Sequence, residues 1–420
     1  LPIRHRSQMG GTLGLGAWSC FLLVVLFSGC LFSRANTNVK RFDALGRVEG
    51  QLQGLSAGSH GYVALYRKDG RSWHPQATRV FFLDAAFGFV VTPQTYAVVA
   101  FEDLNGNARF DLDERGACLG FEKGLVVTPS EAAKVGQLHL VPRGCPAPLP
   151  ISVSNLGETS RELITIHRGD LAQLTEARFA DEASSLHFWE PVVFSDRFGL
   201  GVSFLSQYST QKITVLFVHG ARGSPREFEA VMASLDPNKY QFWIFSYPSG
   251  IRLDLSGNQL KRLLDELWLR HHFERLIVVG HSMGGLVARH ALNEAQSSGS
   301  PWRAERLITL ATPWGGQVSA RSGVEDSPVV IPSWRDIATG SSFLSILLSK
   351  PLATQTRHCL YYAFGSPVGK ASADGVVTVE SQIPTAVQGS AFRQRGFNAS
   401  HAAILADPEV LSEIQRCLLE

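Results

Sequence analysis

Short apolar runs alternate with amphipathic stretches along the C-terminal half of the chain. The apolar runs are predicted to be strands: 213–218, 241–246, 276–279 and 306–310. Between the second and third runs, a predicted helix that starts at Ser256 carries leucines at helical spacing, at 260, 263, 264 and 267. Strands bare of polar residues with helices between them are typical of a parallel sheet covered on both faces. We therefore expect an α/β domain with a mostly parallel sheet over residues 185–420.

The N-terminal part has a different pattern. Short runs rich in Val, Phe and Tyr are separated by turn residues: 61–66, 80–83, 87–91, 96–101 and 137–140. This spacing predicts a small all-β sandwich module over residues 46–142. A proline-rich stretch follows at 142–150 and marks a boundary. Residues 143–184 are therefore expected to be a connecting linker.

The first residues have the pattern of an export signal. Arg4 and Arg6 precede an uncharged stretch whose densest apolar part, 21–27, leads to Ser28, Gly29 and Cys30. Small residues before a cysteine resemble a bacterial lipoprotein signal. We expect residues 1–30 to be a signal peptide of this type, with Cys30 lipidated. The protein would then be exported and held on the bacterial envelope, at the outer membrane or facing the periplasm. An uncleaved membrane anchor and plain secretion are the alternatives.

Length, charge and cysteine content narrow the function. The chain of 420 residues exceeds one typical domain, and a net charge of +2 gives no reason to expect nucleic acid as a partner. The sequence carries no indication of an oligomeric state. Four cysteines beyond the leader fit an oxidising compartment. Because each pair lies within one predicted domain, we expect the disulfides Cys118–Cys145 and Cys359–Cys417, with four buried free thiols as the alternative.

Ser282 stands in the run Gly280-His281-Ser282-Met283-Gly284, between a predicted strand and a predicted helix. In that context a Gly-x-Ser-x-Gly turn exposes a serine hydroxyl at the carboxyl edge of a sheet. The glycines permit a tight and strained backbone. Composition alone would produce such a match on the order of 0.3 times, so an ordinary glycine-rich loop is the alternative. The flanking strand and helix favour a nucleophile.

A serine nucleophile needs a base, and the base needs a carboxylate to orient it. His401 lies in a polar loop just before the last helix, which is where the base of such a serine is expected. A helix-capping or surface histidine is the alternative. Asp374 stands in the loop after the predicted strand at 359–364, which gives the order Ser282, Asp374, His401. The rivals are less favourably placed in the sequence: His290 and His358 for the base, Asp326 and Asp336 for the acid.

Two backbone amides are needed to stabilise the oxyanion that attack on a carbonyl produces. One is expected from Met283, the residue after the serine. The second is expected from the turn at 219–225, at Ala221, with Arg222 as the alternative one residue further on. His219 fits a structural residue of this turn better than a second base.

An acidic loop lies inside the β module at residues 103–114. Its side-chain oxygens suit a hard cation such as calcium. Gly106 falls at the fourth loop position and the flanks predict strands, so the loop departs from the helix-loop-helix calcium pattern. A polar connection that binds nothing is the equal alternative. The candidate calcium ligands are Asp103, Asn105, Asn107, Asp111, Asp113 and Glu114.

Four motifs of the C-terminal half resemble the α/β-hydrolase superfamily: His219-Gly220 with Gly223, His281 to Gly285, Ala311 to Gly316, and Asp374-Gly375. Within it they are similar to bacterial triacylglycerol lipases and GPI inositol-deacylase-like lipases. The resemblance covers residues 185–420, and Trp314 departs from many lipases. It implies an acyl-enzyme mechanism that requires no metal or organic cofactor, so calcium would concern the N-terminal module alone.

The sequence thus predicts an exported serine carboxylic ester hydrolase, a lipase or esterase acting on lipid or small esters. Acyl transfer to another alcohol on the envelope is one alternative. A surface-anchored binding protein with an inert hydrolase fold is another, because a fold alone does not establish activity. An apolar insertion at 317–350 is expected to be a mobile lid, with a plain core helix and loop as the equal alternative.

Mass spectrometry of the mature N-terminus tests the expected lipidation. We expect Cys30 to be the first residue and to carry the mass of a lipid adduct, because small residues precede it after an apolar run. An unmodified residue 30 with upstream sequence still attached would contradict the expectation.

Overall fold

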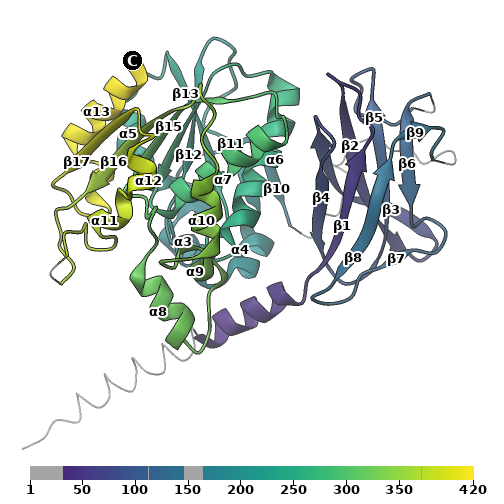
Figure 1. The fold of residues 1–420 in the computed structure, drawn as a ribbon, viewed down its shortest axis with the longest axis horizontal. Coiled ribbons are helices and arrows are strands. Elements are labelled where there is room, and N and C mark those ends of the chain that lie inside the picture. The colour runs from purple at the N-terminus through teal and green to yellow at the C-terminus, as the bar shows by residue number, and fades with distance from the viewer. Residues whose placement is uncertain (1–31, 112, 146–163, 370) are drawn as a thin grey trace, which may run out of the picture.

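The computed structural model describes residues 32–111, 113–145, 164–369 and 371–420. An all-β module and an α/β domain lie side by side (Figure 1). A helix over residues 32–43 runs along the edge of the α/β domain and leads into the first strand of the β module. Cys30 and the rest of the predicted signal peptide lie outside the described residues. Within the described ranges, no helix combines the length and the hydropathy that a membrane span requires.

Two sheets face each other in the β module. One has the strand order β4-β1-β8, and the other has the order β3-β2-β5-β6-β9 with β7 paired to β5. The strands are β1 Gly46–Gln53, β2 His60–Asp69, β3 Ser72–Phe81, β4 Ala86–Val91, β5 Thr95–Asp103, β6 Arg115–Leu119, β7 Leu125–Val126, β8 Ala132–His139 and β9 Val141–Pro142. Neighbours are antiparallel except β1 and β8. Val48 and Phe89 of one sheet pack with Leu65 and Val98 of the other, which builds a sandwich core.

An eight-stranded sheet forms the centre of the α/β domain, in the order β10-β11-β13-β12-β14-β15-β16-β17. Its strands are β10 Ile166–Leu171, β11 Leu200–Phe204, β12 Ile213–Val218, β13 Tyr240–Ser246, β14 Leu276–His281, β15 Ala304–Leu310, β16 Arg357–Ala363 and β17 Arg393–Phe397. All neighbours from β13 to β17 run parallel, and β11 is antiparallel to β13. The predicted fold class, a mostly parallel sheet preceded by a small all-β module, is confirmed.

Helices cover both faces of this sheet. Helices α6, α7 and α10 bury apolar side chains on one face, and α5 and α13 do so on the other. The helices are η1 Ala177–Phe179, α3 Asp181–Trp189, α4 Pro191–Phe198, η2 Pro225–Phe228, α5 Glu229–Ala233, α6 Leu253–His271, α7 Met283–Ser297, α8 Val318–Asp326, α9 Pro332–Ile337, α10 Ser342–Ser349, α11 Val379–Gln382, α12 Thr385–Gln388, η3 Ala403–Leu405 and α13 Pro408–Leu419. Because the parallel strands all end at one edge, the loops that follow β12, β14, β16 and β17 gather there.

The α/β domain begins earlier than the sequence predicts. Strand β10 lies inside the segment 143–184, which was expected to be a linker, and it pairs with β11 as an outermost strand of the sheet. Its polar sequence, with His167, Arg168 and Asp170, lacks the apolar run of a central strand because an edge strand is only partly covered. The helix over residues 32–43 also has no counterpart among the predicted elements.

The apolar insertion at 317–350 folds into α8, α9 and α10. Helix α10 buries Phe343, Leu344 and Leu347 in the core that α7 shares, which fits the core-helix alternative. Helix α8 buries only Ala320, and Val318 at its start is 67 % exposed. A mobile lid therefore stays a prediction for α8 and not for the whole insertion.

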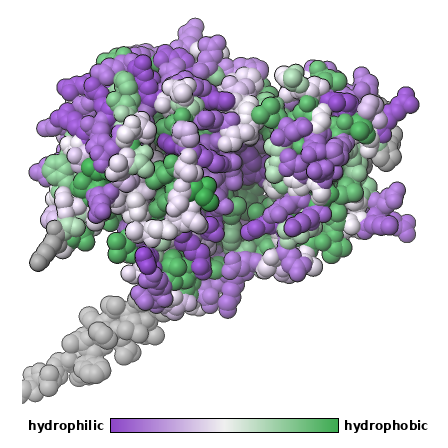
Figure 2. Space-filling model, in the orientation of Figure 1, coloured by the Kyte–Doolittle hydropathy of each residue, from purple (hydrophilic) through white to green (hydrophobic). Residues whose placement is uncertain are grey.

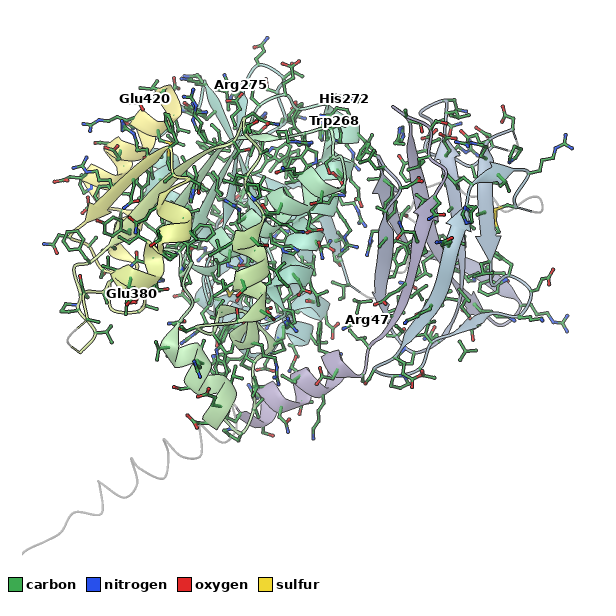
Figure 3. All side chains as sticks on the ribbon, in the orientation of Figure 1. Arg47, Trp268, His272, Arg275, Glu380 and Glu420 are labelled. Carbon is green, nitrogen blue, oxygen red and sulfur yellow. A yellow bond between two sulfur atoms is a disulfide. The ribbon has the colours of Figure 1, made fainter. Side chains whose placement is uncertain are left out.

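The β module packs against the C-terminal end of α6. The rings of Phe82 and Trp268 meet edge to face with their centroids 6.2 Å apart. Leu83 lies so close to Gly299 that a Cβ there would come within 2.5 Å of the leucine side chain. Figure 3 labels Trp268 and His272 at this end of α6. Figure 2 shows a largely hydrophilic face with smaller apolar patches and a hollow between the two parts. The two parts therefore share packed apolar contacts.

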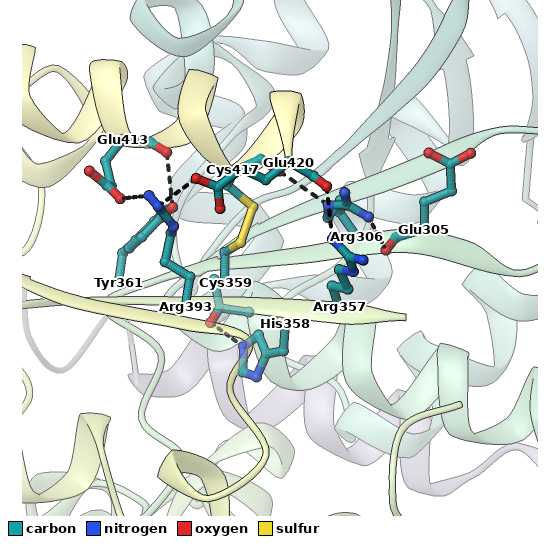
Figure 4. The surroundings of a disulfide bond; sticks show 11 residues. Glu305, Arg306, Arg357, His358, Cys359, Tyr361, Arg393, Glu413, Cys417 and Glu420 are labelled. Atoms are coloured by element: carbon teal, nitrogen blue, oxygen red, sulfur yellow. Dashed lines mark hydrogen bonds and ion pairs between the residues drawn. A yellow bond between two sulfur atoms is a disulfide. The ribbon is translucent and has the colours of Figure 1, made fainter. Parts of the chain in front are cut away.

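Both predicted disulfides are present. Cys118–Cys145 ties β6 to the residues after β9. Cys359–Cys417 ties β16 to α13, with 6.6 Å between the Cα atoms (Figure 4). Beside it, the Tyr361 hydroxyl donates to the backbone oxygen of Glu413 over 3.0 Å. Since β16 leads to Asp374 and α13 follows His401, this disulfide holds together the two segments that carry these residues.

Replacing Cys359 and Cys417 together by alanine should destabilise the α/β domain. The disulfide joins residues 58 positions apart, and removing such a link costs about 2–5 kcal/mol of unfolding free energy. Denaturant unfolding followed by tryptophan fluorescence measures this cost. The matched control, Cys118→Ala with Cys145→Ala, should leave the unfolding of the α/β domain unchanged. A loss below about 1 kcal/mol for the first variant would contradict the expectation.

Candidate active site

Ser282 occupies a sharp turn between β14 and α7. Its backbone angles, φ 51° and ψ −129°, lie in a region that residues with a side chain rarely adopt. Its amide donates to the backbone oxygen of Leu310 in β15 over 2.8 Å, which fixes the turn against the neighbouring strand. The residue is 8 % exposed. The turn therefore has the strained strand-to-helix form that the glycine-serine pattern predicts.

Three glycines let neighbouring segments approach this turn. A Cβ at Gly284 would lie 2.1 Å from the carbonyl oxygen of Val218, at the end of β12. A Cβ at Gly285 would lie 2.1 Å from Thr312 Oγ1, just after β15. A Cβ at Gly280 would lie 2.7 Å from the Cα of Gly285. The turn is thus packed directly between the ends of its two neighbouring strands, and side chains at these positions would push them apart.

Asp374 and His401 lie together and share two hydrogen bonds. His401 Nδ1 lies 2.7 Å from Asp374 Oδ2, and the His401 amide donates to the backbone oxygen of Asp374 over 2.8 Å. The other carboxylate oxygen, Oδ1, accepts from the amides of Val376 and Val377 over 2.9 and 2.7 Å. With Asp374 accepting at Nδ1, the His401 ring leaves Nε2 as its proton acceptor. This is the orientation that a general base requires.

The rival residues are engaged elsewhere. The carboxylate of Asp336 accepts from Arg252 and from the Leu253 amide, where it holds the start of α6. His290 on α7 lies 3.3 Å from the Asn258 side chain. His358 lies at the start of β16, far from the carboxyl edge, and its ring nitrogen is 2.8 Å from Thr309 Oγ1. Burial lowers the pKa of His358 to about 3. The geometry thus favours the pair Asp374 and His401 over these alternatives.

The turn after β12 discriminates between the two candidate oxyanion amides. The Arg222 amide donates to Ser249 Oγ over 3.3 Å. Within the described ranges, neither the Ala221 amide nor the Met283 amide donates to another protein group. Met283 is the first residue of α7, where an amide has no partner inside its own helix. Ala221 and Met283 are therefore the amides that are free to bind an oxyanion.

His219 behaves as a structural residue of this turn, as its position predicts. Its ring is fully buried and stacks on Tyr247 with 4.4 Å between centroids. The Tyr247 hydroxyl donates to the His219 backbone oxygen over 2.8 Å. Burial lowers the pKa of His219, so the ring is neutral near pH 7.

No hydrogen bond joins Ser282 Oγ to His401 within the part of the chain that the structure describes. The His401 ring lies beside the ring of His281, with 4.9 Å between centroids, and His281 immediately precedes Ser282. In sites without a substrate such hydrogen bonds are often long, and they tighten when the substrate binds.

Two residues outside the predicted set connect the parts of this site: His281, which is buried, and Glu227, which is half-buried. His281 Nδ1 lies 3.0 Å from Glu227 Oε1, and His281 Nε2 lies 2.9 Å from the backbone oxygen of His401. The same Glu227 oxygen accepts from the Gly220 amide over 3.1 Å. His281 is inside the serine motif, but nothing in the sequence distinguishes Glu227 from other glutamates. Only the fold brings the end of η2 against the end of β14.

The acidic loop of the β module uses its side chains internally. Asp103 accepts from the amides of Gly106, Asn107 and Ala108. Asp111 accepts from the side-chain amides of Asn105 and Asn107, and Glu114 accepts from two loop amides. Among the described residues no group of three or more His, Cys, Asp or Glu could hold a metal ion. The calcium interpretation therefore gains no support, since these bonds already account for the loop.

Comparisons with known proteins agree with this geometry. Residues 215–411, just under half of the chain, match the model of the alpha/beta hydrolase family. The α/β domain of the chain thus resembles the α/β-hydrolase superfamily, and this match supports a hydrolase. A search of curated proteins finds no match. The narrower likeness to GPI inositol-deacylase-like lipases stays a prediction.

Similar solved structures include three bacterial proteins. The mature form of a Bacillus licheniformis lipase is 19% identical, with a TM-score of 0.41, and the match covers 51% of this chain and 94% of that one. A Legionella pneumophila phospholipase is 17% identical, with a TM-score of 0.34 and coverage of 41% and 44%. A lipase-esterase related protein from Clostridium acetobutylicum is 11% identical, with a TM-score of 0.36 and coverage of 52% and 98%.

Asparagine substitution at the two candidate acids should separate their roles. Asp374→Asn should slow the reaction of Ser282 with a fluorophosphonate probe by about 10⁴-fold, because His401 then takes the wrong tautomer. Asp336→Asn should leave this rate nearly unchanged and lower the unfolding free energy by roughly 1–3 kcal/mol, since Arg252 loses its partner. Labelling kinetics and denaturant unfolding measure both effects. The opposite pattern of rates would assign the acid to Asp336.

Proposed function

We propose that this protein is a serine carboxylic ester hydrolase whose nucleophile is Ser282. The observation that carries the proposal is the strained turn at Ser282, placed at the sheet edge where Asp374 orients His401. A strained elbow of this kind has no evident structural use, because an unstrained turn would join β14 to α7 at lower energy. It does expose a hydroxyl at the start of a helix, where attack on a carbonyl needs it.

In the proposed mechanism Ser282 Oγ attacks the ester carbonyl carbon while His401 Nε2 accepts its proton. The resulting oxyanion accepts hydrogen bonds from the amides of Met283 and Ala221. Asp374 stabilises the imidazolium of His401. The intermediate then expels the alcohol, which takes the proton from His401, and leaves an acyl-enzyme. Water, deprotonated by His401, attacks this acyl group and releases the carboxylic acid. The chemistry needs no metal or organic cofactor.

A lipid-like substrate fits the surroundings of the oxyanion turn. Ala221 packs in an apolar cluster with Ala35, Phe188, Ile331 and Trp334. These side chains come from the helix over 32–43, from α3 and from the segment around α9. Esters with an apolar acyl or alcohol part would lie against such a wall at low cost in desolvation.

The helix over residues 32–43 contributes to this apolar wall and follows the predicted lipidation site, Cys30, in the sequence. Asn38 Oδ1 accepts from the amides of Val192 and Val193 at the start of α4, and Arg41 pairs with Asp196. The helix is therefore fixed to the α/β domain. Phe32, at the start of this helix, packs edge to face on Trp189 of the same apolar wall, with 6.2 Å between the ring centroids. We infer that an anchored enzyme would present its site to esters at the membrane surface. The two disulfides fit an oxidising compartment outside the cytoplasm.

Hydrolysis of nitrophenyl esters of increasing chain length tests the proposal. Ser282→Ala should lower kcat by about 10⁶-fold, because the acyl-enzyme route is lost. Ser345→Ala, an exposed serine of α10, is the matched control and should leave kcat unchanged. If the wild-type protein hydrolyses none of the esters and is not labelled by a fluorophosphonate, a binding protein with an inert hydrolase fold is favoured. If an alcohol is added to the assay, formation of the ester of that alcohol would show acyl transfer.

A further inference from the structure

The His281 ring is held by acceptors at both of its nitrogens. Nε2 faces the His401 backbone oxygen at 2.9 Å, and a carbonyl oxygen only accepts, so Nε2 must carry a proton. Nδ1 faces Glu227 Oε1 at 3.0 Å, and that oxygen also accepts from the Gly220 amide. A carboxylate oxygen that already accepts one N–H is an acceptor for the other as well. A neutral imidazole has a single N–H, so when Glu227 is ionised the two contacts together require an imidazolium.

Glu227 in turn reaches the oxyanion turn. Glu227 lies in η2, and a Cβ at Gly223 would lie 2.2 Å from Glu227 Oε2, so this carboxylate packs directly against the oxyanion turn. Its bond to the Gly220 amide fixes the residue that immediately precedes Ala221. One pair thus contacts the backbone on both sides of the site: the segment that carries His401 and the turn that carries the second oxyanion amide.

We propose that His281 and Glu227 form an ion pair that positions His401 and the Ala221 amide for the proposed reaction of Ser282. The inference rests on the proposed function for its effect on rate, but the ion pair itself is a statement about the fold. Neither side chain touches the reacting atoms, so both are positioning residues.

The charges around the pair agree with this assignment. Burial alone would raise the pKa of Glu227, yet the charge and hydrogen bond of His281 bring it below its usual value. Burial alone would lower the pKa of His281, yet Glu227, the His401 carbonyl and the charge of Asp374 raise it above its usual value. The titratable groups that face His281 are Glu227, His219, His401 and Asp374. Of these, His219 is neutral near pH 7, so the two carboxylates dominate.

A pH dependence follows from the sign of these shifts. The pair is intact from above the lowered pKa of Glu227 up to the raised pKa of His281. As the pH rises through the raised pKa, His281 loses one proton and one of its two contacts. The rate should therefore fall at alkaline pH because of His281.

The rate of Ser282 labelling by a fluorophosphonate, followed across pH, tests the role of the pair. In Glu227→Gln the carboxylate charge is gone and burial lowers the pKa of His281, so the alkaline fall should move about 1–3 pH units lower. The maximal rate should drop roughly 10- to 100-fold through misplacement of His401 and Ala221. Glu305→Gln is the matched control, since it removes a carboxylate paired with Arg275 at the opposite end of the sheet, and its profile should equal the wild type. An unshifted alkaline fall in folded Glu227→Gln would overturn the proposal.

Nitrogen NMR of the histidine rings tests the ion pair without any reaction. In the full chain we expect the His281 ring to have both nitrogens protonated at pH 7, with a signal that disappears in His281→Gln and changes to that of a singly protonated ring in Glu227→Gln. A singly protonated His281 at pH 7 in the wild type would overturn the proposal. If the wild type is not labelled by the fluorophosphonate, the proposed function fails, and this spectrum still decides whether the ion pair exists.

Discussion

The backbone of Ser282 is forced into a strained turn, and the rest of the α/β domain is arranged so that this turn persists. A residue with a side chain at φ 51° and ψ −129° costs on the order of 1–3 kcal/mol, and it survives only where its surroundings determine it. Here strands β12 and β14, which are buried along their whole length, and the buried C-terminal part of β15 provide that constraint. Gly284 and Gly285 allow the strand ends to close around the turn. The strain thus places the serine at the edge where the other loops meet.

Two further constraints bring the remaining groups to that edge. The Cys359–Cys417 disulfide ties the strand that leads to Asp374 to the helix that follows His401. Inside, the contacts of His281 and Glu227 reach the backbone of both the His401 segment and the oxyanion turn. Groups that come from four separate loops are therefore held by the disulfide at the other end of β16 and by the contacts of His281 and Glu227 beside the site. The N-terminal helix adds an apolar wall beside Ala221.

The sequence predicts the parts of this account that depend on local pattern. Continuous apolar runs revealed the central strands, and the glycines around Ser282 revealed the turn between β14 and α7. The order of Asp374 and His401 could be stated because the acid and then the histidine follow the serine along the chain in sites of this kind. Strand β10 was missed because an edge strand has no apolar run, and the helix over residues 32–43 was missed because its contacts are with distant segments. Glu227 could not be predicted, since its role arises from a contact between η2 and β14 that no sequence spacing encodes.

The most direct test of the central claim is a crystal structure of the protein after reaction with a phosphonate ester. We expect a single covalent bond from phosphorus to Ser282 Oγ. One phosphonyl oxygen should lie about 3 Å from the amides of both Met283 and Ala221, and His401 should turn toward the serine oxygen. An adduct on another residue, or a phosphonyl oxygen that faces away from both amides, would contradict the account.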